Sequence, residues 1–322
     1  MILSDSILVR TSSLLWKLSE KGENVWFLRI LNKILVRLRV HQILVRLLLR
    51  LGAKPVVEVK MKDGSNILVD LRSENESGVY YSREYDSGLI KIIENLLNPD
   101  LYFFDIGANI GFYSVAIGTF IKSKKSAGRV IAFEPLDSNY KRLTENLIEN
   151  KLYEHCLAYN LGLSDRSCDA QIVLREDFIK GAETGNCSVS INDEVDGGLI
   201  RKKIRLEKLD TLWPEINLER KKIDIIKMDI EGHEDFCLEG ACQTIKTQRP
   251  VILMEVNKPY YEARGVQLDE RFIPLIPENY SNFRFNGSGW VKINSFYDCS
   301  DFDNVFLIPN ERLELEAYKF LM

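Results

Sequence analysis

Several signals that mark other protein classes are missing from this sequence of 322 residues. Its six cysteines form no C-x-x-C pair and no Cys/His ligand spacing, which argues against a disulfide scaffold or a zinc site. No run of about 18 apolar residues occurs, so no transmembrane helix is expected. The first residues lack a basic leader followed by an unbroken apolar stretch, so no signal peptide is expected. Together these absences predict a cytoplasmic protein.

Acidic residues are missing from residues 24–57, which carry seven basic side chains. The other residues hold 36 basic against 47 acidic side chains, a net charge of −11, which disfavours a nucleic-acid partner. Residues 1–54 lack proline and repeat Leu and Ile at helical spacings, so they predict a basic helical extension over residues 1–55. This helix either contacts the inner membrane surface peripherally or packs on the rest of the chain or a second subunit.

A regular order of strands and helices predicts an α/β fold. A hairpin is expected at 56–71 and a short helix at 88–97, which together form a lead-in over residues 56–100. Apolar strands follow at 101–106, 129–133, 155–161, 223–228 and 251–256, and helices at 112–122, 137–150 and 234–246. Short apolar strands separated by helices predict a mostly parallel sheet with helices on both faces.

Two regions depart from this order. Residues 162–222 show no clear crossover helix, and we expect a hairpin or extended insertion there with a polar loop at 181–198. After the fifth strand, a helix near 269–276 and strands at 283–285, 290–293 and 303–308 predict an antiparallel edge pair. The main domain is therefore expected over residues 101–310, with a C-terminal tail at 311–322.

The first strand of this domain ends in DIGANIG, which contains Asp105, Gly107, Asn109 and Gly111. Ligands of such sheets bind at the carboxyl ends of the strands, where glycines allow a tight turn and a close backbone approach. The spacing is G-x-x-x-G, so the dinucleotide fingerprint G-x-G-x-x-G is missing. The second strand ends in Glu134, a position suited to accept both hydroxyl groups of a ribose.

The fourth and fifth strands end in a group of polar residues. In IDIIKMDIEGHE, Lys227 and Asp229 share one face of the strand, and a lysine inside an apolar strand needs an acidic partner. Glu234 also fits a helix N-terminus, where a carboxylate complements the dipole. Carboxylates of Asp229 and Glu255 on adjacent strands would orient a hydroxyl, act as a base or hold a divalent cation. His233 has no metal-ligand spacing, and no metal ligand is assigned.

These motifs, in their order and spacing, resemble the FkbM family of S-adenosylmethionine-dependent methyltransferases. The resemblance rests on DIGANIGFYS, AFEP, the L-x-x-N pattern at Leu143–Asn146, IDIIKMDIEGHE and VILMEV, and it covers roughly residues 80–260. It implies a class I (Rossmann-like) methyltransferase domain and, usually, O-methylation of a sugar, glycan or natural product. It further implies that the glycine loop from Asp105 to Gly111 holds the methionine part of the cofactor, that Glu134 binds the ribose, and that Leu163 and Ser164 flank adenine. Asp229, Glu231 and Glu255 would face the acceptor.

The leading hypothesis is therefore an S-adenosylmethionine-dependent O-methyltransferase acting on a small-molecule or glycan acceptor. Asp229 is the first candidate for removing the hydroxyl proton, followed by Glu255 or His233. A second hypothesis is a non-catalytic protein that binds S-adenosylmethionine or is recruited to a membrane. It would keep the glycine loop but lack a working acceptor site, and the carboxylates at the fourth and fifth strands argue against it. The identity of the acceptor is left open.

Overall fold

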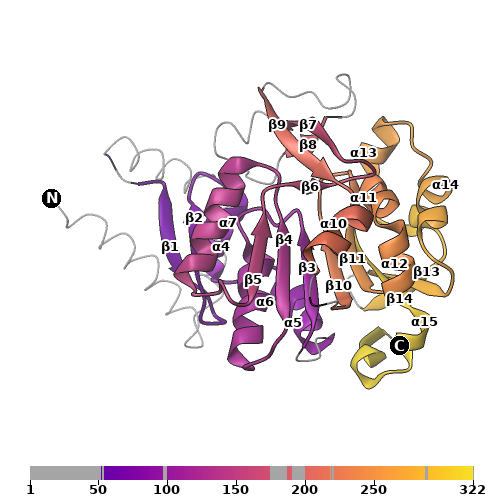
Figure 1. Ribbon diagram of the computed structural model, residues 1–322, viewed down its shortest axis with the longest axis horizontal. Helices are drawn as coiled ribbons and strands as arrows, with labels where there is room; N and C mark the ends of the chain where they lie inside the picture. The colour runs from indigo at the N-terminus through magenta and orange to yellow at the C-terminus, as the bar shows by residue number, and fades with distance from the viewer. Residues whose placement is uncertain are drawn as a thin grey trace, which may run out of the picture.

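Figure 1 presents a computed structural model of the chain. It describes residue 52 and residues 54–96, 100–174, 187–190, 200–217, 219, 221–286 and 289–321. The helix expected over residues 1–55 and most of the loop expected at 181–198 lie outside these residues. In the described part of the chain, no helix is both long enough and apolar enough to cross a membrane.

The main sheet has eight strands in the order β13-β12-β14-β11-β10-β3-β4-β5. Five neighbouring strands are parallel: β5 (Cys156–Tyr159), β4 (Arg129–Phe133), β3 (Tyr102–Ile106), β10 (Ile223–Met228) and β11 (Val251–Asn257). All five were predicted from their apolar runs. Such strands are buried on both faces, which is why hydrophobic residues fill them without alternation.

Helices cover both faces of this sheet, as predicted. One face packs on α5 (Ser87–Leu96), α6 (Phe112–Ser123) and α7 (Asp137–Glu149). The other packs on α10 (Leu209–Ile216), α11 (Glu234–Gly240), α12 (Cys242–Gln248) and α14 (Leu268–Phe272). Because successive strand residues point to opposite faces, Phe103 joins the first core and Phe104 the second.

The C-terminal strands differ from the predicted edge pair. β12 (Tyr280–Phe285), β13 (Trp290–Ile293) and β14 (Phe302–Pro309) are all antiparallel to their neighbours. β14 lies inside the sheet, between β11 and β12, so three strands rather than two extend it. Between β11 and β12 the chain also forms α13 (Lys258–Ala263) and a single 3-10 turn, η1 (Ile273–Leu275), which follows α14.

Four α-helices of the described residues were not predicted, namely α4 (Glu74–Ser82), α10, α13 and α15 (Asn310–Leu313), and one predicted helix is divided. α4 begins at Ser73, whose hydroxyl accepts the N–H of Glu76 at 3.3 Å. The missing crossover helix is α10, which contains Pro214 and is therefore a poor helix by local propensity. The expected helix 234–246 breaks after Gly240, and the carboxylate of Asp210 on α10 accepts the N–H groups of Gln243 and Thr244 at the start of α12.

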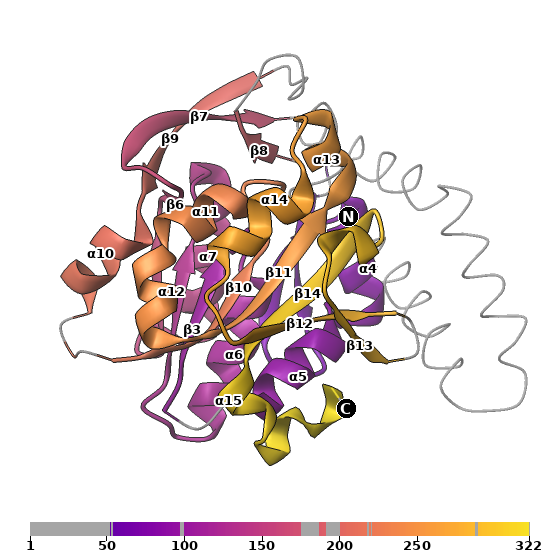
Figure 2. The ribbon, with the colours of Figure 1, turned by 90° about the vertical axis from the view of Figure 1, so that its right-hand side faces the viewer.

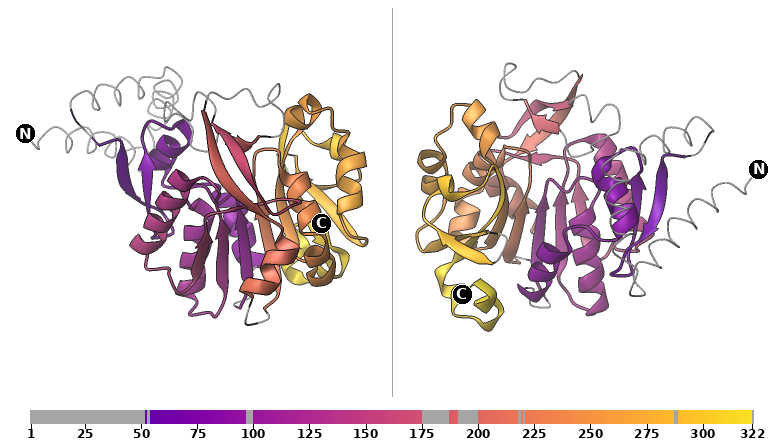
Figure 3. Two further views of the ribbon diagram at one scale, coloured as in Figure 1. Left: turned by 45° about the horizontal axis from the view of Figure 1, so that its top comes forward. Right: turned by 180° about the vertical axis from the view of Figure 1, so that it is seen from behind.

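The hairpin of β1 (Val56–Lys60) and β2 (Asn66–Asp70) is docked on α7, at the edge of the molecule opposite the C-terminal strands (Figure 3). Asn146 on α7 accepts the N–H of Leu68 and donates to the carbonyl of Ile110, both at 2.8 Å. Asn150 forms two further hydrogen bonds with the backbone of Asn66. The asparagine of the L-x-x-N pattern thus ties the hairpin to the glycine loop after β3.

The insertion is a second, four-stranded sheet in the order β6-β9-β7-β8. It consists of β6 (Gly162–Leu163), β7 (Cys168–Leu174), β8 (Cys187–Val189) and β9 (Ile200–Glu207). In Figures 1 and 2, β7, β8 and β9 lie above the main sheet. The extended insertion was predicted, but its position over the main sheet follows from tertiary packing, since Ile172, Leu174, Ile204 and Leu206 form a small core with Leu136.

Candidate functional site

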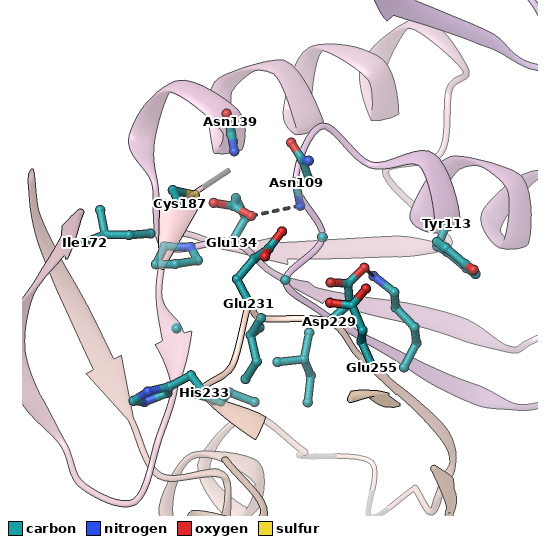
Figure 4. Close-up of a pocket in the computed structure, with 18 of the residues that line it drawn as sticks. Asn109, Tyr113, Glu134, Asn139, Ile172, Cys187, Asp229, Glu231, His233 and Glu255 are labelled. Carbon is teal, nitrogen blue, oxygen red and sulfur yellow. Dashed lines mark hydrogen bonds and ion pairs between the residues drawn. The ribbon is translucent and has the colours of Figure 1, made fainter. Parts of the chain in front are cut away.

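A cavity of about 220 Å³ lies where the loops after β3, β4, β10 and β11 meet the insertion sheet (Figure 4). Most of the predicted site residues line it: Gly107, Asn109, Glu134, Leu163, Asp229, Glu231, His233 and Glu255. Asp105, Gly111 and Ser164 are not among the lining residues. They lie behind the cavity wall, where each holds a lining residue or a neighbouring element in place.

The glycine loop has the backbone geometry that its sequence predicts. Gly107, Asn109 and Gly111 have positive φ values of 77°, 52° and 95°. A Cβ atom on Gly107 would lie 2.0 Å from the carbonyl oxygen of Asp229, so the loop after β3 touches the loop after β10 directly. A Cβ atom on Gly111 would lie 2.6 Å from Leu143 of α7. The two glycines therefore permit contacts that a side chain would prevent.

Asp105 supports the loop from within the core. Its buried carboxylate accepts a hydrogen bond from the hydroxyl of Ser114 at 2.6 Å and lies 3.8 Å from the ammonium group of Lys227. Lys227 also pairs with Asp229 at 3.2 Å, which confirms the predicted acidic partner. Burial lowers the pKa of Lys227, but the negative charges of Asp229 and Asp105 outweigh this and raise it overall, so Lys227 is charged.

Glu134 links the glycine loop to the cavity. Its carboxylate accepts the N–H of Asn109 at 2.8 Å and that of Leu136 at 2.9 Å. Burial raises the pKa of Glu134 to about 7, against the opposite effect of these two hydrogen bonds. The side-chain oxygen of Asn109 is buried in the same wall and has no hydrogen-bond partner among the described residues. This part of the cavity therefore presents oxygen acceptors that suit hydroxyl or ammonium donors.

Carboxylates and aromatic rings form one end of the cavity. Figure 4 shows Asp229 and Glu255 side by side, with Tyr113 nearby. Burial, followed by the negative charges of Asp229 and Glu234, raises the pKa of Glu255 to about 8. The ammonium group of Lys227 lies over the ring of Tyr113, 4.8 Å from its centroid. The rings of Tyr85 and Phe112 are stacked, with their centroids 4.1 Å apart. No motif or spacing in the sequence marks Tyr85, Phe112 or Tyr113 as site residues.

The loop after β10 is fixed by buried side chains. Glu231 has a φ of 55° and its side chain lies at the cavity between Glu134 and Asp229 (Figure 4). The carboxylate of Glu234 accepts the N–H groups of Ile230 and Gly232 and the hydroxyl of Tyr261. Its position at the start of α11 matches the alternative given for it from the sequence, a carboxylate at a helix N-terminus. Arg264 donates to the carbonyl of Gly232 at 2.8 Å.

His233 lies at the other end of the cavity, away from Asp229 and Glu255 (Figure 4). Apolar residues line this end, among them Leu163 after β5 and Ile172, Val189 and Leu206 from the insertion sheet. The hydroxyl of Ser164 lies 2.9 Å from Nε2 of His233. The insertion residues of this wall could not be selected from the sequence, because their contact with the cavity depends on the second sheet.

No three or more His, Cys, Asp or Glu side chains gather as a metal-binding group in the part of the chain that the structure describes.

Comparisons with known proteins agree with this architecture. A family model described as the methyltransferase FkbM domain matches residues 105–287, more than half of the chain. The chain is 28% identical over 221 residues to the methyltransferase sdnD of Sordaria araneosa, covering 57% of this chain and 80% of that protein. It is 29% identical over 188 residues to the AMB antimetabolite synthetase AmbE of Pseudomonas aeruginosa, covering 50% of this chain but only 9% of that protein.

Among solved structures, the methyltransferase FkbM from Methylobacillus flagellatus is similar, with a TM-score of 0.41 and 17% identity. This match covers 69% of the present chain and 46% of the other.

Proposed function

Because the chain belongs to the FkbM methyltransferase family and has its class I Rossmann-like fold, we propose that it transfers a methyl group from S-adenosylmethionine to a hydroxyl group of a sugar, glycan or other natural product. The observation that carries this proposal is that one cavity joins two different groups of residues. An acceptor-rich wall lies around Glu134, and one end of the cavity holds Asp229 and Glu255.

The wall residues suit S-adenosylmethionine. The carboxylate of Glu134 can accept both ribose hydroxyls while its position is held by two backbone N–H groups. The side-chain oxygen of Asn109, which has no hydrogen-bond partner among the described residues, and the side chain of Glu231 suit the cofactor's positively charged ammonium group. The apolar wall around Leu163, Ile172 and Leu206 suits a flat base. When bound there, S-adenosylmethionine supplies an electrophilic methyl group.

Glu255 is our first candidate for the proton acceptor at the other end. Its pKa of about 8 makes its carboxylate a stronger base than an ordinary glutamate, yet one that is available near neutral pH. Asp229, the first candidate from the sequence, is instead held by Lys227 at 3.2 Å. This ion pair suits Asp229 to orient the acceptor hydroxyl for in-line attack on the methyl carbon. The hydroxyl oxygen would form the new bond to the methyl carbon as the carbon–sulfur bond of the sulfonium breaks and S-adenosylhomocysteine leaves, and the hydroxyl proton would pass to Glu255.

The aromatic rings of Tyr85 and Phe112 beside these carboxylates favour a small acceptor with both polar groups and an apolar face. One relative is named as an antimetabolite synthetase, which supports a natural-product acceptor. We further propose that no nucleic acid is involved, because the residues outside 24–57 are net acidic. Cytoplasmic location and contact of residues 1–55 with a membrane or a second subunit stay predictions.

The test begins with extracts of cells from which the gene has been deleted, because these hold the unmethylated acceptor. Purified protein and S-adenosylmethionine are added, and mass spectrometry searches for a compound that gains one methyl group. A product methylated on oxygen supports the proposal. If the protein binds S-adenosylhomocysteine but no extract yields a product, the non-catalytic alternative is favoured.

Variants then separate the two carboxylates. Glu255→Gln is expected to lower turnover about 10²- to 10⁴-fold, the contribution of a general base, while leaving S-adenosylhomocysteine affinity unchanged. In wild-type protein the turnover should rise with pH near pH 8, and this rise should be lost in Glu255→Gln. Asp229→Asn should also lower turnover but retain this pH dependence. If Glu255→Gln methylates at the wild-type rate, Asp229 takes the role of base. Sensitivity to EDTA would point to metal activation instead.

A further inference from the structure

The cavity is too small to enclose both a cofactor and a whole acceptor. Its volume is about 220 Å³, below the roughly 300–1,000 Å³ of pockets that enclose one drug-sized ligand. Under the proposed function, S-adenosylmethionine occupies the part around Glu134, which leaves the end beside Asp229 and Glu255 for the reacting hydroxyl group. The remainder of the acceptor therefore has to lie on the surface next to these two carboxylates.

The register of the main sheet shows which residues continue from Glu255. Glu255 of β11 pairs with Asn304 of β14. Continuing the pairing of β12 with β14 by one residue beyond Arg284 brings Phe285 opposite Asn304, and Phe285 pairs in turn with Trp290 of β13. Because directly paired residues point to the same face of a sheet, these side chains form one row across β11, β14, β12 and β13, which lie side by side in Figure 2. Three strand spacings of about 4.8 Å make the row about 14 Å long.

The far part of this row is an aromatic surface. Phe285 is 47% exposed, and Phe302, its diagonal neighbour on β14, is 64% exposed and points to the same face as Asn304. The ring of Trp290 lies 5.5 Å from that of Phe285 and packs on Phe306, with centroids 4.8 Å apart. Large apolar side chains that gather on a surface mark a site of interaction. We call Phe285, Trp290 and Phe302 the aromatic platform.

An open aromatic surface suits sugar rings better than an apolar chain. The hydrophobic effect scales with the apolar area removed from water, and an apolar chain on an open surface keeps much of its own area in water. A sugar ring has an apolar face of C–H groups that can cover an aromatic ring, while the hydroxyl groups at its edge stay in water or pair with side chains. The amide of Asn304, between Glu255 and Phe285, offers both a donor and an acceptor to such hydroxyl groups.

We propose that the aromatic platform is a second binding site for the acceptor, which holds sugar units of a glycan beside the unit that is methylated. The inference rests on the proposed function and narrows its acceptor to a glycan of at least two sugar units. Asp229 and Glu255 act on one hydroxyl group inside the cavity, and the platform binds units farther along the glycan. The platform residues determine specificity and take no part in methyl transfer.

The test measures transfer of a deuterium-labelled methyl group from S-adenosylmethionine into the extract of deletion cells, before and after acid hydrolysis of its glycans to single sugars. Wild-type protein should label the intact extract far more than the hydrolysed one. Hydrolysis of the labelled product should then release the label on a single sugar.

A double variant, Phe285→Ala with Phe302→Ala, tests the platform itself. It should lower labelling of the intact extract at low acceptor concentration about 5- to 100-fold, the effect of losing aromatic contacts from a binding surface. Labelling at saturating acceptor and the affinity for S-adenosylhomocysteine should not change. Tyr153→Ala is the matched control, because it removes a ring that is 67% exposed beside β5, at the opposite edge of the sheet.

Three results overturn the inference and leave the proposed function standing: a labelled product without sugar, equal labelling of the intact and hydrolysed extracts, or a double variant that labels the intact extract as wild type does. If that variant labels normally but loses a dimer in light scattering, a second copy of the chain covers the platform instead. If it loses affinity for S-adenosylhomocysteine, Phe302→Ala alone decides by the same comparison. Wild-type protein that labels no extract refutes both the inference and the proposed function.

Discussion

Replacing Gly107 by alanine tests how closely the two loops of the site are joined. The added Cβ atom would lie 2.0 Å from the carbonyl oxygen of Asp229 and 2.8 Å from Cγ2 of Ile230. Gly107 also has a φ of 77°, which an L-residue adopts at a cost of about 1–2 kcal/mol. Forcing extra atoms into a packed site adds typically 1–3 kcal/mol. We therefore expect Gly107→Ala to lower the free energy of unfolding by about 2–5 kcal/mol.

Gly64 provides the matched control for this substitution. It has a φ of 91°, similar to that of Gly107, but an added Cβ atom would meet nothing within 4 Å. Gly64→Ala should therefore cost only the backbone part, about 1–2 kcal/mol. The difference between the two variants isolates the steric part of the cost.

Urea denaturation followed by circular dichroism measures both variants, and calorimetry with S-adenosylhomocysteine measures the site. Gly107→Ala should lose most affinity, because the glycine loop and the loop carrying Asp229 must separate. Gly64→Ala should bind as wild type does. If the two variants are equally stable and bind equally well, the close approach of the loops is not required and the reasoning is wrong.

Three further predictions concern charge. Glu134→Ala should weaken S-adenosylhomocysteine binding by about 1.5–3 kcal/mol, the scale of a hydrogen bond to a charged group, and equal affinity in calorimetry would contradict the ribose contact. Burial raises the pKa values of Glu134 and Glu234 to about 7 and of Glu255 to about 8, above the ordinary 4.5. The stability these groups contribute is fully present below pH 4.5 and is lost as pH rises through 7–8. Between pH 5 and 8.5, the midpoint of urea denaturation should fall less steeply with pH in Glu234→Gln than in wild type. Identical slopes in the two proteins would contradict a contribution of Glu234 to this loss. Arg264→Met leaves the buried Asp235 carboxylate with one fewer partner and should cost up to about 3–5 kcal/mol, whereas the Lys141→Met control removes an exposed ion pair and should leave the stability nearly unchanged. If urea denaturation shows the same loss of stability in both variants, the buried ion pair contributes no more than the exposed one.

Local sequence signals were sufficient for much of the fold. Apolar runs located β3, β4, β10 and β11, because strands buried on both faces must be apolar throughout. One signal was available but not used: Ser73 and Glu76 form the S-x-x-E pattern that marks the start of α4. α10 had no such signal, since Pro214 disfavours the helix locally and packing on the sheet stabilises it.

The sequence by itself determined the glycine loop, the strand ends that carry Glu134, Asp229 and Glu255, and the need of Lys227 for an acidic partner. These follow from backbone sterics, strand alternation and the cost of burying a charge, all of which act over a few residues. Only the tertiary structure decided that the insertion sheet lies over the cavity and that Glu255 is buried beside Asp229. It also decided that His233 contacts Ser164, because the two residues are 69 positions apart in the chain. Partners so far apart leave no periodic pattern, and their contact exists only once the chain has folded.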